Sequence, residues 1–315
     1  KGLCVNLFEN QWHSLINHEI IGFMNTPILK ARKGSQELVF YNENDYLKWK
    51  ETNMQGKWNV KYYKGLGTST SKEFKEYFEQ KKCVYFSHTP TCDNQIDMVF
   101  NKKRADDRKD WLANYSRTDT VDITNKAVSY TDFIDKEMKH FSKYDCDRSI
   151  PNLIDGLKIS QRKIVYSAFK KNLTSEIKVA QFSGYVSEHS CYHHGEASLN
   201  GAIVGLAQNF VGSNNINLFK PNGQFGTRLN GGKDSASERY IFTQLSPITR
   251  FIFRHEDDNV LDYLHDDGTK VEPVYYVPII PMLLVNGTKG IGTGFSTDIP
   301  CYNPLEIIDY ISCYL

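Results

Sequence analysis

The sequence has no Cys-x-x-Cys pair, although it contains seven cysteines. Their number is odd and they are scattered along the chain, which favours free thiols in a reducing compartment and argues against a structural zinc site. Long apolar runs are also missing. The longest stretch without a charged or strongly polar residue, 274–285, contains two prolines and is too short to cross a bilayer. With no signal-peptide pattern at the start, we expect a soluble intracellular protein.

An excess of charge of either sign is missing too, because 38 Lys and Arg residues stand against 37 Asp and Glu residues. Net charge therefore gives no argument for or against a polyanionic partner, and any case for nucleic acid must be local. With 315 residues, of which 40% are hydrophobic, the chain can bury a core, and its length suggests about two domains. It opens without methionine and stops inside a stretch, 304–315, that we predict to be helical, so we expect a longer parent protein.

The first 86 residues have the pattern of the end of an α/β domain. Apolar strands are predicted at 28–31 and 38–41, and a helix is predicted from Lys72 to about Gln80. Thr70 and Glu73 have the spacing of a capping box, which places the start of this helix.

The stretch 87–144 is highly charged, and we predict a helical, solvated connecting segment there. Charged residues follow one another most closely between residues 102 and 110. The Lys-Lys-Arg at 102–104 also fits a nuclear-localisation sequence, but the pattern favours an ordinary charged helix face.

In the second half of the chain the pattern predicts two amphipathic helices joined by an irregular segment. The first begins near a Ser160 cap and has apolar residues on one side, with Lys163, Tyr166 and Lys170 on the opposite side. The second follows Gly195. Such a pair is compatible with a helix-turn-helix unit.

Strand-like sequence follows these helices. A strand is predicted at 240–243, and Ser246 and Pro247 are typical of a helix start. Two helices followed by a strand pair suggest a winged helix. From Val271 onward, short apolar strands and glycine turns suggest a further, mostly β region.

A cluster of basic residues on the first of these helices is one candidate for a binding function. Cations opposite the apolar side of a helix can lie along a phosphate backbone. Basic faces are also common on ordinary solvated helices, and the pattern alone favours that interpretation. The cluster consists of Lys158, Arg162, Lys163, Lys170 and Lys171.

The Tyr-His-His-Gly-Glu segment at 192–196 is a second candidate. Imidazole can donate a hydrogen bond to a phosphate oxygen, and it titrates near neutral pH. With Cys191 the pair could also ligate a metal, but a second pair of ligands is missing from the pattern. Without further context, histidines hydrogen-bonded at a helix start are the simpler interpretation.

Tyr240, which follows Arg239, is a third candidate. The chain has 19 tyrosines, and most of them must be packing residues. A phenol is a weak nucleophile at neutral pH, and an adjacent guanidinium could stabilise both the phenolate and the charge that develops on an attacked phosphate. This neighbour distinguishes Tyr240 chemically.

The glycine turns at 65–67 and 290–292 do not fit a phosphate loop, because lysine and hydroxyl residues are not at the required places. Tight turns explain both. Ile291 is nonetheless unusual, since a β-branched apolar residue between two glycines can be exposed at a hairpin tip.

Taken together and in this order, these segments resemble the eukaryotic-type type IIA DNA topoisomerases. The resemblance covers essentially the whole chain. Glu238 before Arg239 and Ile159 after Lys158 depart from the family pattern and suggest a divergent member, such as the enzyme of a large cytoplasmic DNA virus. The matching segments are Lys-Tyr-Tyr-Lys-Gly-Leu-Gly-Thr-Ser at 61–69, Lys-Arg-Ala-Asp-Asp-Arg-Lys at 103–109, Arg-Ser-Ile-Pro-Asn at 148–152, Asp-Gly-Leu-Lys at 155–158 with Gln-Arg-Lys at 161–163, Tyr-His-His-Gly-Glu at 192–196, Gly-Gly-Lys-Asp at 231–234 up to Arg-Tyr at 239–240, and 286–294.

The resemblance implies a multidomain chain of α/β and α+β class. It would run from the C-terminal part of a TOPRIM domain (1–86) through a helical linker (87–144). A winged-helix domain with the catalytic tyrosine (145–265) and the beginning of a mostly β tower domain (266–315) would follow. The ATPase domain and the C-gate of the family would lie outside this chain.

The same resemblance implies the chemistry. Tyr240 would attack a DNA phosphodiester and form a transient 5′-phosphotyrosyl bond in a double-strand break for strand passage. Arg239, Arg148 and His194 would hold the scissile phosphate. Ile291 would be an apolar wedge that kinks the duplex. The remaining DNA contacts would come from Lys64, Lys158, Gln161, Arg162 and Lys163.

The resemblance also implies cofactors and partners for the parent enzyme, an ATP-hydrolysing isomerase. Mg²⁺ would be bound by acidic residues just upstream of Lys1, with no metal ligand in this chain, and ATP by a separate upstream domain. The partners would be double-stranded DNA and a second copy of the protein, with no membrane. The site of action would be the nucleus or, for a viral enzyme, the host cytoplasm. From this chain alone we expect DNA binding at most.

Two other classes of function remain open at this point. A non-catalytic module that bends DNA would share the winged helix, the basic helix and the wedge, but would not need Arg148, His194, Arg239 and Tyr240 as a set. A nucleotide-binding phosphotransferase is suggested only by the glycine turns, and the missing phosphate loop argues against it.

Overall fold

The structure is a computed structural model that describes residues 1–53, 57–63, 65–122, 125–266 and 269–315. The chain divides into two compact units, Lys1–Lys143 and Tyr144–Leu315. Within the described residues, no helix is long and apolar enough to cross a membrane.

The main core of the first unit lies on a three-stranded sheet in the order β1-β5-β6. β5 pairs antiparallel with β1 and parallel with β6. Val5, Ile96 and Phe133 are buried against it from three different helices. The strands are β1 (Gly22–Met24), β5 (Cys83–Ser87) and β6 (Ala127–Ser129), and the helices that follow or cover them are α1 (Gly2–Gln11), α2 (His13–Ile16), α5 (Cys92–Phe100), α6 (Ala105–Ala113), α7 (Tyr130–Phe133), the π-helix η2 (Ile134–Met138) and α8 (Lys139–Ser149).

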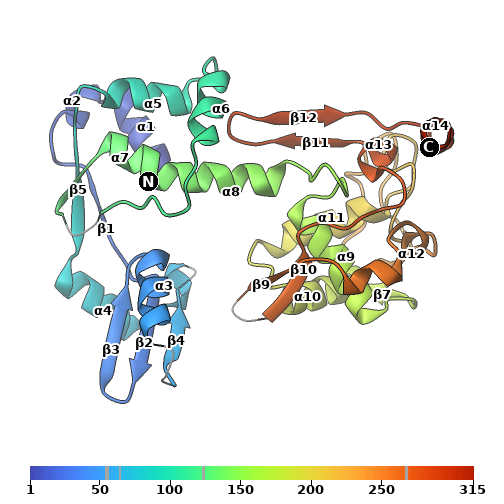
Figure 1. Ribbon diagram of the computed structural model, residues 1–315, viewed down its shortest axis with the longest axis horizontal. Coiled ribbons are helices and arrows are strands. Elements are labelled where there is room, and N and C mark those ends of the chain that lie inside the picture. The colour runs from blue at the N-terminus through green and yellow to red at the C-terminus, as the bar shows by residue number, and fades with distance from the viewer. Residues whose placement is uncertain (54–56, 64, 123–124, 267–268) are drawn as a thin grey trace. The chain divides into compact units, whose positions relative to one another are not determined.

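A second, smaller sheet in the first unit has the order β3-β2-β4, with antiparallel pairing throughout. Its strands are β2 (Leu29–Lys33), β3 (Gln36–Phe40) and β4 (Asn59–Tyr62). Figure 1 shows α3 (Glu43–Thr52) lying along this sheet, where Tyr46 and Trp49 pack against Phe40. The predicted strands at 28–31 and 38–41 are therefore confirmed, with small shifts of their ends.

The capping box predicted at Thr70 and Glu73 is present at the start of α4 (Ser71–Gln80). The Thr70 side chain accepts from the Glu73 backbone, and the Glu73 carboxylate accepts from the Thr70 backbone. A short 3₁₀ turn, η1 (Leu66–Thr68), precedes it. The local rule placed this helix correctly because both partners lie within one turn of each other.

The stretch 87–144 was predicted to be a solvated connection, and this prediction was wrong. Its strand β6 extends the main sheet, and Cys92, Ile96, Val128 and Phe133 are buried in the same core as Val5. The prediction rested on the charged residues at 102–110, which follow one another closely. They fall in and just before α6, whereas the apolar residues of α5 and α7 form the packed surface.

The second unit contains three consecutive helices, α9 to α11, and two strand pairs that follow or flank them. β7 pairs antiparallel with β8, and β9 pairs antiparallel with β10. One continuous core includes Ile164, Phe182 and Ile203 from the three helices. The elements are α9 (Ile159–Lys171), β7 (Ile177–Lys178), α10 (Val179–His189), α11 (Glu196–Ala207), β8 (Phe242–Thr243), α12 (Thr249–Ile252), the 3₁₀ turn η3 (His255–Asn259), β9 (Tyr263–Asp266) and β10 (Thr269–Pro273).

Several local predictions in this unit need correction. The segment expected to be irregular contains α10, whose Val179, Phe182 and Val186 are fully buried on one face. α9 begins one residue before Ser160, and its N-cap is Lys158. The strand expected at 240–243 is reduced to β8, and the helix expected at Ser246 is the short α12. Gly184 and the β-branched residues of α10 lower its helix propensity, and burial of its apolar face outweighs this.

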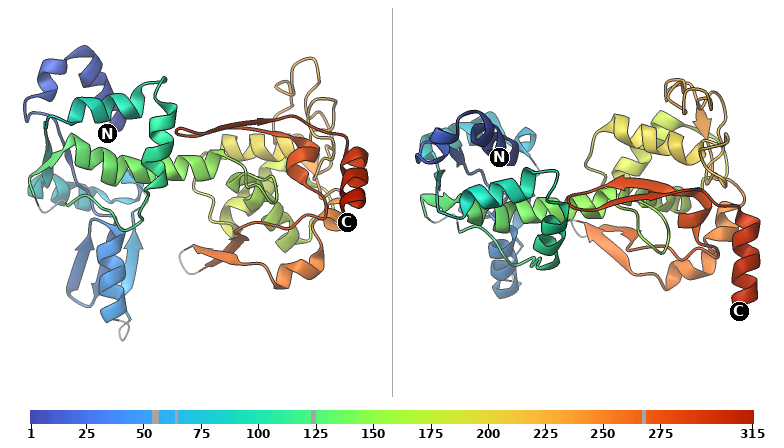
Figure 2. Two further views of the ribbon diagram at one scale, coloured as in Figure 1. Left: turned by 45° about the horizontal axis from the view of Figure 1, so that its top comes forward. Right: turned by 90° about the horizontal axis from the view of Figure 1, so that it is seen from above.

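The last part of the chain contains the hairpin of β11 (Thr288–Ile291) and β12 (Ser296–Ile299) between two helices, α13 (Met282–Asn286) and α14 (Pro304–Tyr314). The predicted final helix is confirmed as α14. The hairpin runs beside the end of α8 in both views of Figure 2, and a Cβ on Gly292 would meet Cys146 of that helix. Tyr276, Met282 and Val285 are buried in the same core as α9, so this stretch packs onto the helices α9 to α11.

Candidate functional site

Tyr240 lies in a loop that is fixed at both sides while its side chain is 71% exposed. The carbonyl of Glu238 accepts from the N–H of Ala180, and the carbonyl of Ile241 accepts from the N–H of Val179. These are among the donors that a helix leaves without intrahelical partners at its N-terminus. The start of α10 thereby anchors the loop, and the buried side chain of Ile241 adds a second anchor.

Arg239 is the charged neighbour of Tyr240. Its guanidinium lies 5.8 Å from the centroid of the Tyr240 ring, and its Nε donates to the Ser237 hydroxyl at 3.3 Å. Within the described part of the chain, no carboxylate forms an ion pair with Arg239. The guanidinium is therefore available to an external anion beside the Tyr240 phenol.

His194 lies in the loop before α11 and is held by two tyrosines. Its Nε2 is 2.7 Å from the Tyr144 hydroxyl, and its ring packs against the edge of Tyr192 with centroids 5.4 Å apart. Partial burial lowers the pKa of His194, and positive charge on Arg148, His193 and Lys163 lowers it further. The imidazole is thus kept neutral in the neutral pH range.

The loop that carries His194 is tied to the rest of the unit by Lys163. Its ammonium donates to the carbonyl of Ser190 and forms an ion pair with Glu272 at 2.8 Å. The Lys163 side chain is only 12% exposed and that of Glu272 only 3%. One cation therefore connects α9, the histidine loop and β10.

Arg162 is buried rather than exposed, with 4% of its surface accessible. Its Nε donates to Asp155 Oδ2 at 2.7 Å, and its terminal nitrogen donates to Asp155 Oδ1 and to the Leu157 carbonyl. Asp155 also accepts from the backbone N–H groups of Leu157 and Tyr276. Every oxygen of this buried carboxylate is satisfied, as a buried charge requires.

These positions correct the expectation of an exposed basic face on α9. Tyr166 is buried, and Lys163 has its own acidic partner. Helical spacing shows which residues share a side, but it cannot show what covers that side. Here β10 covers it and brings Glu272 from a distant part of the sequence.

Lys158 and Gln161 lie at the start of α9. The Gln161 side chain accepts from the backbone N–H of Lys158 at 2.9 Å, so its carbonyl oxygen helps to cap the helix. The Lys158 side chain is half-buried, and this burial lowers its pKa. Within the described residues no carboxylate pairs with Lys158. Lys64, which was also predicted to contact DNA, lies outside the described residues.

Two glycines bring the predicted motifs together. Gly156 has φ +70, and a Cβ there would meet the backbone nitrogen of Leu283 at 2.7 Å. A Cβ on Gly290 would collide with the carbonyl of Ser149. The loop before Lys158 therefore packs against α13, and β11 packs against the residue that follows Arg148.

Ile291 ends β11 and is 82% exposed, which confirms that it lies at a hairpin tip. The chain turns between Ile291 and Ser296, which pair across the hairpin. An apolar side chain that is so exposed at a tip has no packing role within this unit.

The predicted catalytic residues fall into two groups. Arg239 lies beside Tyr240, whereas Arg148 and Tyr144 lie near His194. Among the described residues, no hydrogen bond or ring contact joins the two groups. Tyr144 was missed by the sequence analysis, because nothing in the charged stretch around it distinguishes it from the other tyrosines.

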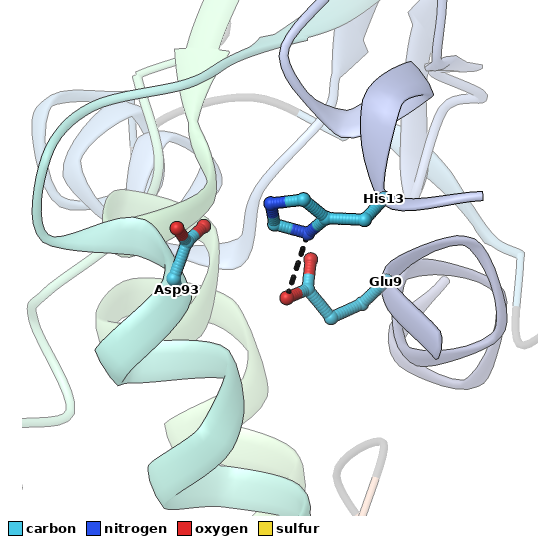
Figure 3. Close-up of side chains that lie close together, drawn as sticks. All are labelled: Glu9, His13 and Asp93. Carbon is cyan, nitrogen blue, oxygen red and sulfur yellow. Dashed lines mark ion pairs between the residues drawn. The ribbon is translucent and has the colours of Figure 1, made fainter. Parts of the chain in front are cut away.

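One group of side chains in the first unit has the ligand types of a metal site: Glu9, His13 and Asp93 (Figure 3). Glu9 is already paired with His13 at 3.1 Å, and Asp93 with His88 at 2.7 Å. An imidazole within the cluster does not suit Mg²⁺, which prefers oxygen ligands. Two neighbouring ion pairs account for the arrangement, so we assign no metal to it.

Two protein-family models match the chain. The one that describes the A subunit of DNA gyrase/topoisomerase IV matches residues 148–315. The one that describes the C-terminal associated domain of TOPRIM matches residues 24–146. Between them they cover both compact units apart from the first residues.

Curated relatives and a solved structure agree with these matches. The chain is 52% identical over 323 residues to a DNA topoisomerase 2 of Plasmodium falciparum, covering 100% of this chain and 23% of the relative. It is 50% identical to DNA topoisomerase 2-alpha of Rattus norvegicus, covering 99% of this chain and 21% of the relative. The crystal structure of the Plasmodium falciparum topoisomerase II DNA-binding, cleavage and re-ligation domain matches with a TM-score of 0.84 and 51% identity, covering 99% of this chain and 43% of that one. The chain thus spans about a fifth of the length of these curated relatives.

Proposed function

The chain belongs to the type IIA DNA topoisomerases, and we propose that it acts as the DNA-cleavage and religation segment of such an enzyme, with Tyr240 as the nucleophile. The observation that carries this proposal is the pairing of Tyr240 with Arg239. The phenol is exposed and its backbone is anchored to α10, while the neighbouring guanidinium has no acidic partner among the described residues. A polyanion such as duplex DNA would supply that partner.

The proposed reaction exchanges one phosphodiester for another. The phenolic oxygen of Tyr240 forms a bond to phosphorus while the bond from phosphorus to the 3′ oxygen breaks. The phenolic proton is lost, and the departing 3′ oxygen gains a proton. Because no net bond energy is lost, attack by the 3′ hydroxyl reverses the step and reseals the strand.

Arg239 is proposed to stabilise the extra negative charge that develops on the attacked phosphate, since a positioned charged donor is worth most where charge appears. Arg148, which is exposed, and His194 would hold the same phosphate from the second group. A neutral imidazole can donate one hydrogen bond to a phosphate oxygen without adding charge. Both groups would then contact one phosphate when DNA is bound.

Lys158 is proposed to supply a salt-dependent contact to the DNA backbone. Arg162 and Lys163 are proposed to support this contact indirectly, because their charges are held by Asp155 and Glu272. Gln161 would act through its hydrogen bond to the Lys158 backbone. Lys64 remains a proposed contact from outside the described residues.

Ile291 is proposed to insert between base pairs and kink the duplex. Smooth bending of DNA costs on the order of 1–6 kcal/mol, which added protein contacts offset. Its exposure of 82% at a hairpin tip supports this role. We expect Ile291→Ala to bend DNA less than the wild type, as fluorescence energy transfer between labelled DNA ends would show. Identical bending would leave Ile291 as a turn residue only.

For the full-length protein we propose Mg²⁺ and ATP as cofactors and a homodimer as the working form. The acidic ligands of Mg²⁺ are proposed to lie outside this chain. Bound Mg²⁺ would polarise the phosphate as a Lewis acid. The enzyme would act in the nucleus or, if it is viral, in the host cytoplasm.

The test uses the full-length protein with supercoiled plasmid and Mg²⁺, adding denaturant to trap covalent protein–DNA adducts. Tyr240→Phe should abolish the adducts and leave DNA affinity nearly unchanged, because only the nucleophilic oxygen is lost. Tyr310→Phe is the matched control, since Tyr310 is also 71% exposed.

Adducts that persist in Tyr240→Phe would place the nucleophile elsewhere. The wild-type protein could also bind and bend DNA without forming adducts, under conditions where a related topoisomerase cleaves. That result would favour the alternative of a non-catalytic DNA-bending module.

A further inference from the structure

Tyr144 contacts the proposed phosphate-binding histidine from a separate element. It lies in α8, and its hydroxyl is 2.7 Å from Nε2 of His194, fifty residues later in the chain. The two rings lie 6.2 Å apart at a tilt of 39°. Within the described part of the chain, the His194 ring has no other hydrogen-bond partner.

The contact matters because a neutral imidazole has one nitrogen that donates and one that accepts, and its neighbours decide which is which. A tyrosine hydroxyl that donates to Nε2 makes that nitrogen the acceptor and leaves the proton on Nδ1. Partial burial lowers the pKa of His194, and electrostatic repulsion from its neighbours, Arg148 first among them, lowers it further, so the neutral form is the relevant one.

We propose that Tyr144 is a positioning residue for DNA cleavage, whose hydroxyl donates to Nε2 of His194 and so presents Nδ1–H as the donor to the scissile phosphate. This inference rests on the proposed function. It assigns different tasks to the two tyrosines around the ring. Tyr192 is buried and packs against the ring, which restricts its tilt, whereas Tyr144 sets the position of the proton.

The first test measures the state of the ring and needs no catalysis. The nitrogen of a neutral imidazole that carries the lone pair attacks a carbonyl carbon of diethylpyrocarbonate, forming a carbethoxy-imidazole and releasing ethyl carbonate, which becomes ethanol and carbon dioxide. In the proposed tautomer this nitrogen is Nε2, which the Tyr144 hydroxyl occupies. In the DNA-free full-length protein, Tyr144→Phe should therefore raise the rate of His194 modification several-fold, as peptide mass spectrometry would show.

His255, which is exposed in the same unit, serves as the internal control and should react at the same rate in both proteins. Equal rates for His194 in the wild type and in Tyr144→Phe would overturn the proposal. They would mean that the lone pair lies on Nδ1 and that Nε2 donates to Tyr144.

The second test measures whether Tyr144 acts through His194. A hydrogen bond is worth about 0.5–1.5 kcal/mol, so Tyr144→Phe should slow adduct formation by roughly 3- to 10-fold, with DNA affinity unchanged. In a His194→Ala background the same substitution should change the rate by less than about twofold, because neighbours that act as a unit are not additive. Tyr310→Phe should have no effect in either background.

A similar loss in both backgrounds would make Tyr144 a structural residue of α8 and overturn the inference. If wild-type protein forms no adduct while diethylpyrocarbonate still distinguishes Tyr144→Phe from wild type, the proposed function fails. The contact would then stand as part of the fold, and the positioning role would be overturned with that function.

Discussion

The second unit uses basic residues in two opposite ways. Arg162 and Lys163 are buried or nearly so, and their charges are neutralised by Asp155 and Glu272. Arg239 is exposed beside Tyr240, and no acid among the described residues pairs with it. The difference teaches that a group of basic residues is not a uniform contact surface. One part holds the loops in place, and the other stays available to an external anion.

The largest expected effect follows from breaking a buried pair. Arg162→Met leaves the Asp155 carboxylate without its cation, and removing one partner of a buried ion pair costs about 3–5 kcal/mol. We expect a loss of this size in the free energy of unfolding of the second unit, measured by denaturant titration of the full-length protein with hydrogen exchange to locate the change. The double variant Asp155→Asn with Arg162→Met should recover part of the loss, because no charge is then stranded and the amide oxygen can still accept from a backbone N–H.

Arg254 provides the matched control for this experiment. Its ion pair with Glu256 is exposed, with side-chain accessibilities of 58% and 70%. Exposed ion pairs contribute little to stability because solvent screens them, so Arg254→Met should be nearly neutral. Equal losses for Arg162→Met and Arg254→Met would remove the distinction between the two uses of basic residues.

The next largest effect concerns Arg239, the exposed arginine beside Tyr240. Arg239→Gln should slow adduct formation by about 100- to 1,000-fold, the cost of losing one well-placed donor to developing charge. The free energy of unfolding should change little, because Arg239 is exposed. Among the described residues, its side chain has a hydrogen bond only to the Ser237 hydroxyl and a ring contact only to Tyr240. Single-turnover cleavage of a labelled duplex measures the rate, and thermal unfolding measures the stability. A variant that unfolds but cleaves normally when folded would reverse the assignment.

Part of this comparison was predictable from the sequence. Local rules placed α4 through its capping box, because its partners lie within four residues, and the final helix, α14, was predicted directly. The residue types around Tyr240 predicted a nucleophilic role for it, and this role stays a prediction. The hairpin tip at Ile291 followed from its two flanking glycines.

The rest depended on partners that are distant in the sequence. Glu272 lies 109 residues after Lys163, and Tyr144 lies 50 residues before His194. No spacing rule predicts which strand will cover a helix face, so α9 was predicted with an exposed basic side. The π-helix η2 and α7 were also not predicted as parts of a core. The dense charges at 102–110 suggested a solvated segment throughout 87–144.

The buried carboxylate of Glu73 in the first unit allows the stabilising effect of a buried charge to be tested by changing the pH. Burial on its own would raise the pKa of Glu73, but hydrogen bonds from Thr70, Tyr63 and Lys61 outweigh it and lower the pKa to about 2. A lowered pKa means that the folded state favours the carboxylate. The stabilisation is therefore complete above the ordinary value of 4.5 and is lost as the pH falls from there towards 2.

Glu73→Gln should cost about 1.5–3 kcal/mol at neutral pH, the range for hydrogen bonds to a charged group, and the cost should shrink in acid. Hydrogen exchange of α4 in the full-length protein, at pH 7 and at pH 4, measures both. Glu79→Gln in the same helix is the control, because Glu79 is exposed and has no side-chain hydrogen bond or ion pair among the described residues. A loss that is independent of pH would show that packing of the side chain, rather than its charge, stabilises the helix start.

The smallest expected effect distinguishes a lysine that is unpaired among the described residues, Lys158, from a lysine held by an ion pair, Lys163. Lys158→Gln should reduce the slope of log affinity for DNA against log salt concentration by about one unit, since one phosphate contact and its released counterion are lost. Lys163→Gln should leave that slope unchanged and instead destabilise the histidine loop, because its ammonium is held by Glu272 and the Ser190 carbonyl. Binding titrations at several salt concentrations distinguish the two. If both variants flatten the slope equally, Lys163 leaves Glu272 to reach DNA, and the division between buried and exposed cations holds only for the free protein.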